Sequence, residues 1–263
     1  MGVGVLREER MAGEYYRVAD MRTRVESITH SVGLVIGAFA FATVVSSATV
    51  SLHPGLVLTT TGVESTTPLA YAVLTASQFV GFFAAIAAYL GWRAELTLFE
   101  VDLPSVRDAA WVVGGFVALY GINVGISVLF QSLGLEMATN QVITDGEQDA
   151  TRFLFLIPVT LLFVAPAEEL LFRGIVQGLF RRAYGLVPGV VLASALFGLF
   201  HWFALSGSGS GKLSYVATAA VLGLVLGALY ELTDNITVPI AVHGLYNTLL
   251  FVGQYLAVTG AVA

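Results

Sequence analysis

The chain has 263 residues, of which 57% are hydrophobic and 11% are charged, and its formal net charge is −6. A soluble globular domain carries roughly 25% charged residues, so this composition excludes an ordinary soluble domain and indicates a protein surrounded mostly by lipid. The absence of cysteine excludes disulfides, thiolate metal sites and a cysteine nucleophile. The sequence lacks the stripe of basic residues that would favour a nucleic acid as partner. We therefore expect an integral, multi-pass protein of the cell membrane.

Residues 1–27 are polar and carry charges of both signs. The apolar segment that follows them is long enough to cross a bilayer, unlike the short core of a cleaved secretory signal. We expect residues 1–27 to form a cytoplasmic N-terminal tail.

After the tail, hydropathy predicts an all-α, polytopic transmembrane helix bundle with about seven spans, or six to eight. The fourth predicted helix is long enough to be two shorter ones. The expected helices lie near Ser31–Leu52, Leu69–Trp92, Ala109–Leu133, Arg152–Arg181, Leu186–Leu205, Leu213–Tyr230 and Ile236–Val258.

The distribution of arginines predicts the orientation of these helices. Five arginines lie in the N-terminal tail, and further arginines flank the second loop and follow the fourth helix. Segments 53–68 and 134–151 contain no lysine or arginine. Because cytoplasmic loops carry an excess of Lys and Arg, we expect a cytoplasmic N-terminus.

The fourth predicted helix contains two adjacent carboxylates and an arginine, Glu168, Glu169 and Arg173. Ionisable groups inside a bilayer are costly, so each one is a candidate functional residue. Glu169 and Arg173 share a helix face at a spacing of four residues, and we expect them to pair. Glu168 has no partner on its own helix, which suits a group that takes up and returns a proton.

The fifth and seventh helices carry two further polar motifs at the same spacing. Phe197 and His201 share one face of the fifth helix, and His243 and Asn247 share one face of the seventh. An imidazole and a carboxamide together offer two hydrogen-bond donors, which could stabilise an oxyanion. Counted along each helix, these groups lie at compatible depths, so we expect them to converge.

The three motifs, in this order on successive helices, resemble the CAAX-processing and bacteriocin-processing membrane protease family, also called CPBP or Abi. The family motifs EExxxR, FxxxH and HxxxN are present here as Glu168-Glu169-xxx-Arg173, Phe197-xxx-His201 and His243-xxx-Asn247. The resemblance covers roughly residues 152–250. It divides the chain into the tail, N-terminal transmembrane helices over residues 28–150 and a CAAX-protease-like catalytic bundle over residues 151–258.

The resemblance implies an intramembrane endopeptidase that hydrolyses a peptide bond in or next to the membrane, in CAAX-type or leader-peptide-type processing. It implies that Glu168 and His201 hold and activate the attacking water, while His243 and Asn247 form the oxyanion site. It also implies that Glu169, with Arg173 and Phe197, supports this site. The expected partners are the lipid bilayer and a membrane-associated peptide or lipidated protein substrate, without nucleic acid.

The sequence leaves the cofactor open. A zinc site needs three ligands and a water, and Glu168, His201 and His243 could supply the three. The chain has no HExxH motif, however, and the same residues explain a glutamate mechanism that uses no metal. We expect no obligatory metal, with a divalent metal such as zinc as the alternative.

Two other functions are compatible with the same residues. One is a non-catalytic family member that acts as a membrane scaffold or as an immunity protein against peptide toxins. The other is a proton-coupled transporter, because buried Glu and His residues also serve in proton relays. The sequence shows no internal repeat of the kind found in many transporters, which counts against the second.

Overall fold

The computed structural model describes residues 15–60, 63–93 and 104–261 of the chain. Residues 1–14 of the predicted tail lie outside this described part. The described residues form an all-α bundle, and six of their helices are long and apolar enough to cross a membrane. The predicted fold class is therefore confirmed.

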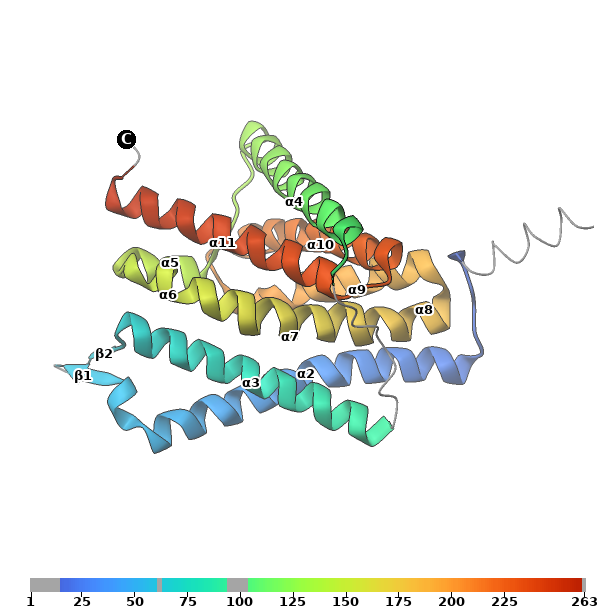
Figure 1. The fold of residues 1–263 in the computed structure, drawn as a ribbon, viewed down its shortest axis with the longest axis horizontal. Helices are drawn as coiled ribbons and strands as arrows, with labels where there is room; N and C mark the ends of the chain where they lie inside the picture. Colours follow the sequence, from blue (N-terminus) through green and yellow to red (C-terminus); the bar gives the residue numbers. More distant parts are fainter. Residues whose placement is uncertain (1–14, 61–62, 94–103, 262–263) are drawn as a thin grey trace, which may run out of the picture.

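The first two spans, α2 (Met21–Leu52) and α3 (Pro68–Arg93), pack along each other on one side of the bundle (Figure 1). Helix α2 begins ten residues before the expected Ser31, because the Asp20 side chain caps it by accepting a hydrogen bond from the backbone of Thr23. The connection between α2 and α3 contains a short helix and a hairpin: η1 (Pro54–Leu56), β1 (Leu58–Thr60) and β2 (Val63–Ser65).

Helix α4 (Val106–Ser132) lies at an angle on the opposite side of the bundle (Figure 1). It begins at a capping box in which Ser105 and Asp108 satisfy each other's backbone N–H groups. The segment that follows, for which the sequence analysis predicted no element, contains strand β3 (Thr139–Asn140) and the short helix α5 (Gln141–Gln148).

The fourth span is one continuous helical element over residues 151–184, and it runs through the middle of the bundle (Figure 1). It is therefore a single span and does not divide into two. Two π-helical segments interrupt its α-helical parts, and the first lies between Pro158 and Pro166, which lack backbone donors. Its parts are α6 (Thr151–Val159), η2 (Thr160–Val164), α7 (Ala165–Glu169), η3 (Leu170–Gln177) and α8 (Gly178–Tyr184).

The C-terminal elements surround this central helix. They are α9 (Leu186–Phe200), η4 (His201–Ala204), β4 (Leu205–Ser206), α10 (Gly209–Thr233) and α11 (Thr237–Thr259). Strand β4 pairs antiparallel with β3. Helix α11 forms where the seventh span was expected but is not among the six most apolar helices, because polar side chains such as His243, Asn247 and Gln254 lower its hydropathy.

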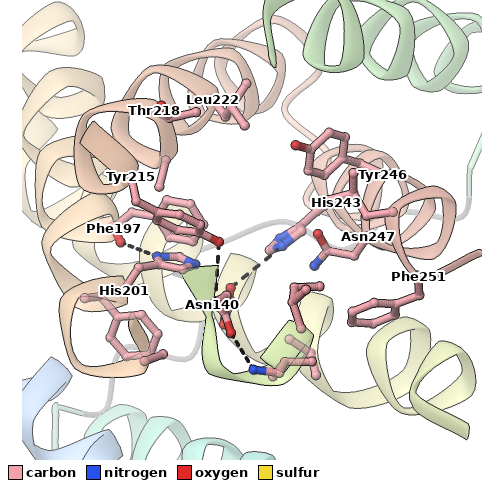
Figure 2. Close-up of a pocket in the computed structure, with 18 of the residues that line it drawn as sticks. Asn140, Phe197, His201, Tyr215, Thr218, Leu222, His243, Tyr246, Asn247 and Phe251 are labelled. Carbon is pink, nitrogen blue, oxygen red and sulfur yellow. Dashed lines mark hydrogen bonds and ion pairs between the residues drawn. The ribbon is translucent and has the colours of Figure 1, made fainter. Parts of the chain in front are cut away.

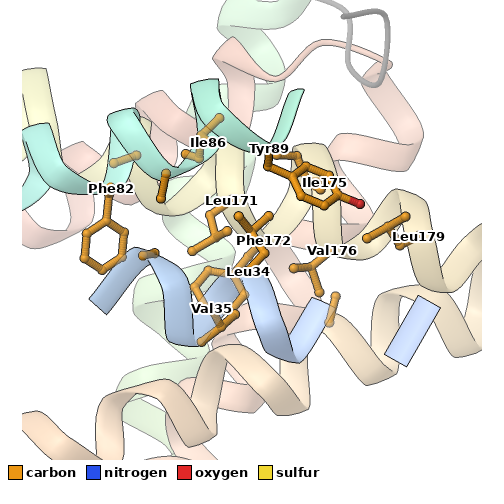
Figure 3. Packing of buried hydrophobic residues seen from close by; sticks show 14 of the residues in the cluster. Leu34, Val35, Phe82, Ile86, Tyr89, Leu171, Phe172, Ile175, Val176 and Leu179 are labelled. Carbon is orange, nitrogen blue, oxygen red and sulfur yellow. The ribbon is translucent and has the colours of Figure 1, made fainter. Parts of the chain in front are cut away.

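A hydrophobic core joins the N-terminal helix pair to the central helix (Figure 3). Leu34 of α2 and Phe82 of α3 belong to the same buried cluster as Phe172 and Ile175 of η3. Phe172 and Ile175 are fully buried. This packing holds the N-terminal helices against the segment that carries Glu168 and Glu169.

A row of hydrogen bonds joins the central helix to α10, and we call it the polar ladder. Its members recur every four residues on both helices, so they lie on facing stripes. The bonds run from Arg173 Nη2 to Gly223 O (3.2 Å), from Gln177 Nε2 to Gly227 O (3.2 Å) and Glu231 Oε1 (2.9 Å), and from Arg181 Nη1 to Glu231 Oε2 (2.6 Å).

The two glycines allow α10 to approach closely enough for these bonds. A Cβ atom added to Gly227 would lie 2.7 Å from Gln177 Oε1 and 3.0 Å from Val190 Cγ1. A Cβ atom at Gly223 would lie 3.2 Å from the Phe197 ring. Small residues at a spacing of four are the usual means of close helix packing in lipid.

Candidate active site

Five of the sequence-predicted residues, Phe197 among them, line a single cavity of about 840 Å³ (Figure 2). Glu168 comes from α7, His201 from the start of η4, and His243 and Asn247 from α11. The structure thus brings together residues that are up to 79 positions apart in the chain, from 168 to 247. Such a cavity can admit a substrate.

Glu169 is fully buried beside this cavity, and its Oε1 atom contacts two side chains. His243 Nδ1 is 2.7 Å and Arg173 Nη1 is 3.0 Å from Glu169 Oε1. The predicted pairing of Glu169 with Arg173 is confirmed. Because a carboxylate can only accept, His243 donates from Nδ1, and its Nε2 atom is left for other partners.

The Nε2 atom of His243 is directed toward Glu168. It lies 3.8 Å from Glu168 Oε2, which exceeds the length of a hydrogen bond. Within the described part of the chain, the Glu168 carboxylate accepts no hydrogen bond. Glu168 has no hydrogen-bond partner on its own helix, as expected, and the structure places the His243 imidazole of α11 beside it. The carboxylate is thus positioned at the cavity with its acceptor capacity unused.

His201 is oriented by the residue one helical turn before it. Its Nδ1 atom is 2.8 Å from the Phe197 carbonyl oxygen, and the two rings contact edge to face with centroids 4.7 Å apart. Since a carbonyl only accepts, Nδ1 carries the proton, and Nε2 of the neutral ring is left as an acceptor. The structure therefore confirms that Phe197 and His201 share one face.

The phenyl ring of Phe197 also contacts two other groups of the site. The Arg173 guanidinium lies over this ring, 4.4 Å from its centroid, and the ring meets the His243 imidazole edge to face. Phe197 lines the cavity, whereas Arg173 and Glu169 do not. The positive charge of Arg173 is therefore held beside the site and paired with Glu169, outside the space that a substrate can enter.

Tyr215 and Asn140 are among the polar residues of the cavity that the sequence analysis missed. The Asn140 side chain donates to the Tyr215 hydroxyl at 3.5 Å, and the Tyr215 ring lies 6.0 Å from the His201 ring (Figure 2). Tyr215 has no polar residue four positions away on its helix, unlike the three motifs, and Asn140 is in a connecting segment. Tyrosine is also common in membrane spans because it lies at the membrane–water interface. The sequence therefore did not indicate that either residue lines the cavity.

The geometry does not match a three-ligand metal site. Among the residues that the structure describes, no group of three His, Cys, Asp or Glu side chains lies close enough together to hold a metal ion. Glu168, His201 and His243 line the same cavity but do not form such a group. A structural zinc or catalytic zinc centre requires three or four protein ligands at about 2.0–2.3 Å.

Comparison with known families bears on this C-terminal bundle. Residues 150–249 match the model of a family described as "Type II CAAX prenyl endopeptidase Rce1-like". This segment of the chain is therefore similar to that family. The resemblance expected from the three motifs is confirmed, because all seven motif residues lie within the match. No curated protein and no solved structure matches the chain significantly.

The matched segment extends from the start of α6 into α11 and excludes α2, α3 and α4. Those three helices nevertheless contribute to the cavity, for example through Ser46 of α2, Gln78 of α3 and Asn123 of α4. The wall of the cavity is therefore completed by a part of the chain that the family match does not cover.

Proposed function

We propose that this chain is an intramembrane endopeptidase that hydrolyses a peptide bond in or next to the membrane, in CAAX-type or leader-peptide-type processing. One observation carries the proposal: Glu168, His201, His243 and Asn247 line one cavity within a domain that matches a protease family. The substrate is a membrane-associated peptide or a lipidated protein that reaches the cavity from the bilayer.

In the mechanism we propose, Glu168 and His201 hold a water molecule. The Nε2 atom of His201 accepts one hydrogen bond from this water, and Glu168 removes the other proton as the oxygen attacks the substrate carbonyl. A C–O bond forms and the carbonyl becomes a tetrahedral oxyanion. Glu168 then returns the proton to the amide nitrogen, the C–N bond breaks, and an acid and an amine are released.

His243 and Asn247 stabilise the oxyanion in this scheme. Because Glu169 occupies the Nδ1 proton of His243, His243 can donate to the oxyanion only as an imidazolium, through Nε2. The side-chain amide of Asn247, one turn further along α11, supplies a second donor. The Tyr215 hydroxyl supports the reaction as a third polar group next to His201. The mechanism includes no step through a metal.

We also propose that the N-terminus is cytoplasmic, on the basis of the arginines in the tail and in the alternate loops. This orientation can be tested by attaching a reporter to each end of the chain and measuring which side of the membrane it reaches.

The enzyme is tested by measuring peptide cleavage with the purified protein in detergent. Test substrates are a farnesylated CAAX peptide and a panel of membrane-protein segments. The Glu168→Gln variant should lose roughly 10²–10⁴-fold in rate, because it removes the proton acceptor. Glu26→Gln is the matched control, since Glu26 is an exposed residue of α2 far from the cavity lining, and it should cleave like the wild type.

Equal rates of cleavage by the wild type and Glu168→Gln would refute the proposed mechanism. If no substrate is cleaved but the protein still binds peptides, the scaffold or immunity function gains support. Proton-coupled flux in liposomes that Glu168→Gln abolishes would instead favour a transporter.

A further inference from the structure

A second hollow in the described part of the chain lies on the helix pair α2 and α3, apart from the cavity that contains Glu168. It is a groove of about 300 Å³ that extends along α2 from Thr29 to Phe41 and along α3 from Ala85 to Trp92. We call it the α2–α3 groove. None of the residues that line it also lines the larger cavity.

Two glycines of α2 leave this groove open. A Cβ atom added to Gly33 or Gly37 would meet no other atom within 4 Å. The floor of the groove is formed by Leu34 and Tyr89, which are buried and belong to the core cluster that includes Phe172 of η3 (Figure 3). The groove is therefore a recess in the outer surface of the bundle, and its floor packs against the central helix.

The dimensions of the groove suit a single hydrocarbon chain. At 1.5 Å per residue, the path along α2 from Thr29 to Phe41 is about 18 Å long. One leaflet contributes about half of the roughly 30 Å hydrocarbon core of a bilayer, so the groove is about as long as one leaflet is thick. A helix of the same length, about 10 Å in diameter, would occupy roughly 1,400 Å³, which far exceeds the volume of the groove.

Polar groups are present at one end of the groove only. There, His30 Nδ1 is 3.1 Å from the Tyr89 hydroxyl oxygen, and the imidazole centroid is 5.5 Å from that of Trp92. Among the described residues, the Thr29 hydroxyl, His30 Nε2 and the Trp92 indole N–H take part in no hydrogen bond. From Gly33 onward the lining on α2 is apolar. Three available polar groups thus lie at the end of an apolar recess.

The charges of the two helices lie at this same end. Arg22 and Arg24 are near the start of α2, and Arg93 is the last residue of α3. The carboxylates nearby are Asp20, which caps α2, and Glu26, which pairs with Arg22 at 2.8 Å. Arg93 lies close enough to Glu26 to interact with its charge. The rest of both helices contains no Lys, Arg, Asp or Glu, so the polar end of the groove carries a net positive charge.

We propose that the α2–α3 groove binds an anionic phospholipid. One acyl chain lies in the groove between Gly33 and Phe41, and the phosphate lies at the polar end near Arg93. Thr29, His30 Nε2 and Trp92 donate hydrogen bonds to the phosphate, while His30 Nδ1 accepts from the Tyr89 hydroxyl. Basic pockets between transmembrane helices are known sites for anionic headgroups. This site is separate from the proposed peptidase site and does not depend on it.

The fluorescence of Trp92 provides a direct test. The double variant Trp111→Phe/Trp202→Phe keeps Trp92 as the single tryptophan of the chain and serves as the parent. In detergent, the parent is titrated with phosphatidylglycerol or phosphatidylcholine that carries bromine on the acyl chains, because bromine quenches a tryptophan that it contacts. Phosphatidylglycerol should reach half-maximal quenching at a concentration about fivefold lower, the effect of one arginine. Equal concentrations for the two lipids would overturn the proposal.

Filling the groove tests the position of the acyl chain. Gly37→Leu in the parent places a side chain in open space within the groove and should abolish the preference for phosphatidylglycerol. Gly121→Leu is the matched control, because Gly121 is equally open but lines neither the groove nor the larger cavity. It should be quenched like the parent. A preference that persists in Gly37→Leu would overturn the assignment of the groove.

Removing one charge tests the position of the phosphate. Arg93→Gln should weaken the binding of phosphatidylglycerol about fivefold and leave that of phosphatidylcholine unchanged. Arg107→Gln is the control, because Arg107 is near the start of α4, on the opposite side of the bundle (Figure 1). Equal affinities of the two variants for phosphatidylglycerol would overturn the assignment of Arg93.

Two other occupants of the groove predict different results. Inorganic phosphate should not displace the brominated lipid, and displacement would overturn the proposal in favour of a simple anion site. A second copy of the chain in the groove would make the molar mass, measured by light scattering after size exclusion, fall from dimer to monomer in Gly37→Leu, which would also overturn it. Size exclusion further checks that each variant is folded. None of these measurements uses cleavage, so this proposal and the proposed function can fail separately.

Discussion

The ion pair between Glu169 and Arg173 gives the most direct prediction about stability. The side chains are 0% and 1% exposed, and their atoms are 3.0 Å apart. In Glu169→Gln, Arg173 can still donate to the amide oxygen of the glutamine and to the Gly223 carbonyl, but neither these oxygens nor the Phe197 ring neutralises its charge. Removing one member of a buried ion pair costs about 3–5 kcal/mol, so Glu169→Gln should be destabilised by about this much.

The double variant Glu169→Gln/Arg173→Met removes both charges together. Replacing a whole buried pair by neutral or apolar groups is often close to neutral. The double variant also loses the hydrogen bond to Gly223, at about 1 kcal/mol. We therefore expect its stability to lie within about 2 kcal/mol of the wild type, so it should be more stable than Glu169→Gln alone.

Thermal unfolding in detergent, followed by tryptophan fluorescence, measures these differences. About 2–4 °C per kcal/mol is expected for a chain of this size, so Glu169→Gln should unfold about 10 °C below the wild type and the double variant only a few degrees below it. Glu26→Gln breaks the exposed pair with Arg22 and should leave the unfolding temperature unchanged. A double variant that unfolds at a lower temperature than Glu169→Gln alone would refute the reasoning.

Three further predictions concern packing, catalysis and metal dependence. Gly227→Ala places a methyl group 2.7 Å from Gln177 Oε1 and should lower the unfolding temperature by several degrees, whereas Gly178→Ala, with no atom within 4 Å, should not. Tyr215→Phe removes a hydroxyl beside His201 and should lower kcat about tenfold at unchanged KM, while Tyr255→Phe, outside the cavity, should have no effect. Dialysis of the wild type against a chelator should leave cleavage unchanged, and a loss that zinc restores would contradict this expectation.

Helical periodicity explains why part of the site could be predicted from the sequence. Glu169 with Arg173, and Phe197 with His201, are four residues apart, and a continuous helix places such residues on one face. Both contacts are present in the structure. The fold class was predictable for a related reason, since bilayer thickness sets the length of each apolar run.

The remaining features depend on contacts between distant segments, which periodicity does not determine. His243 approaches Glu168 from a helix 75 residues further along the chain, and the sequence does not specify this register. Helix α5 was not expected because it is short and has few apolar residues. The contribution of α2, α3 and α4 to the cavity was also missed, because their isolated polar side chains form no motif.

The polar ladder has a consequence for how the chain is made. Arg173 has Glu169 on its own helix, but its second hydrogen-bond partner and the partners of Gln177 are on α10, 50 or more residues later in the sequence. When the central span first leaves the ribosome, those partners do not yet exist, and an arginine in the middle of a bilayer costs about 2.5–3.5 kcal/mol on insertion scales. The central span should therefore remain next to the insertion machinery, or pair with α2 and α3, until α10 has been synthesised. We therefore expect insertion of the central span to be completed only after Gly223 and Gly227, whose carbonyls accept these hydrogen bonds, have been synthesised.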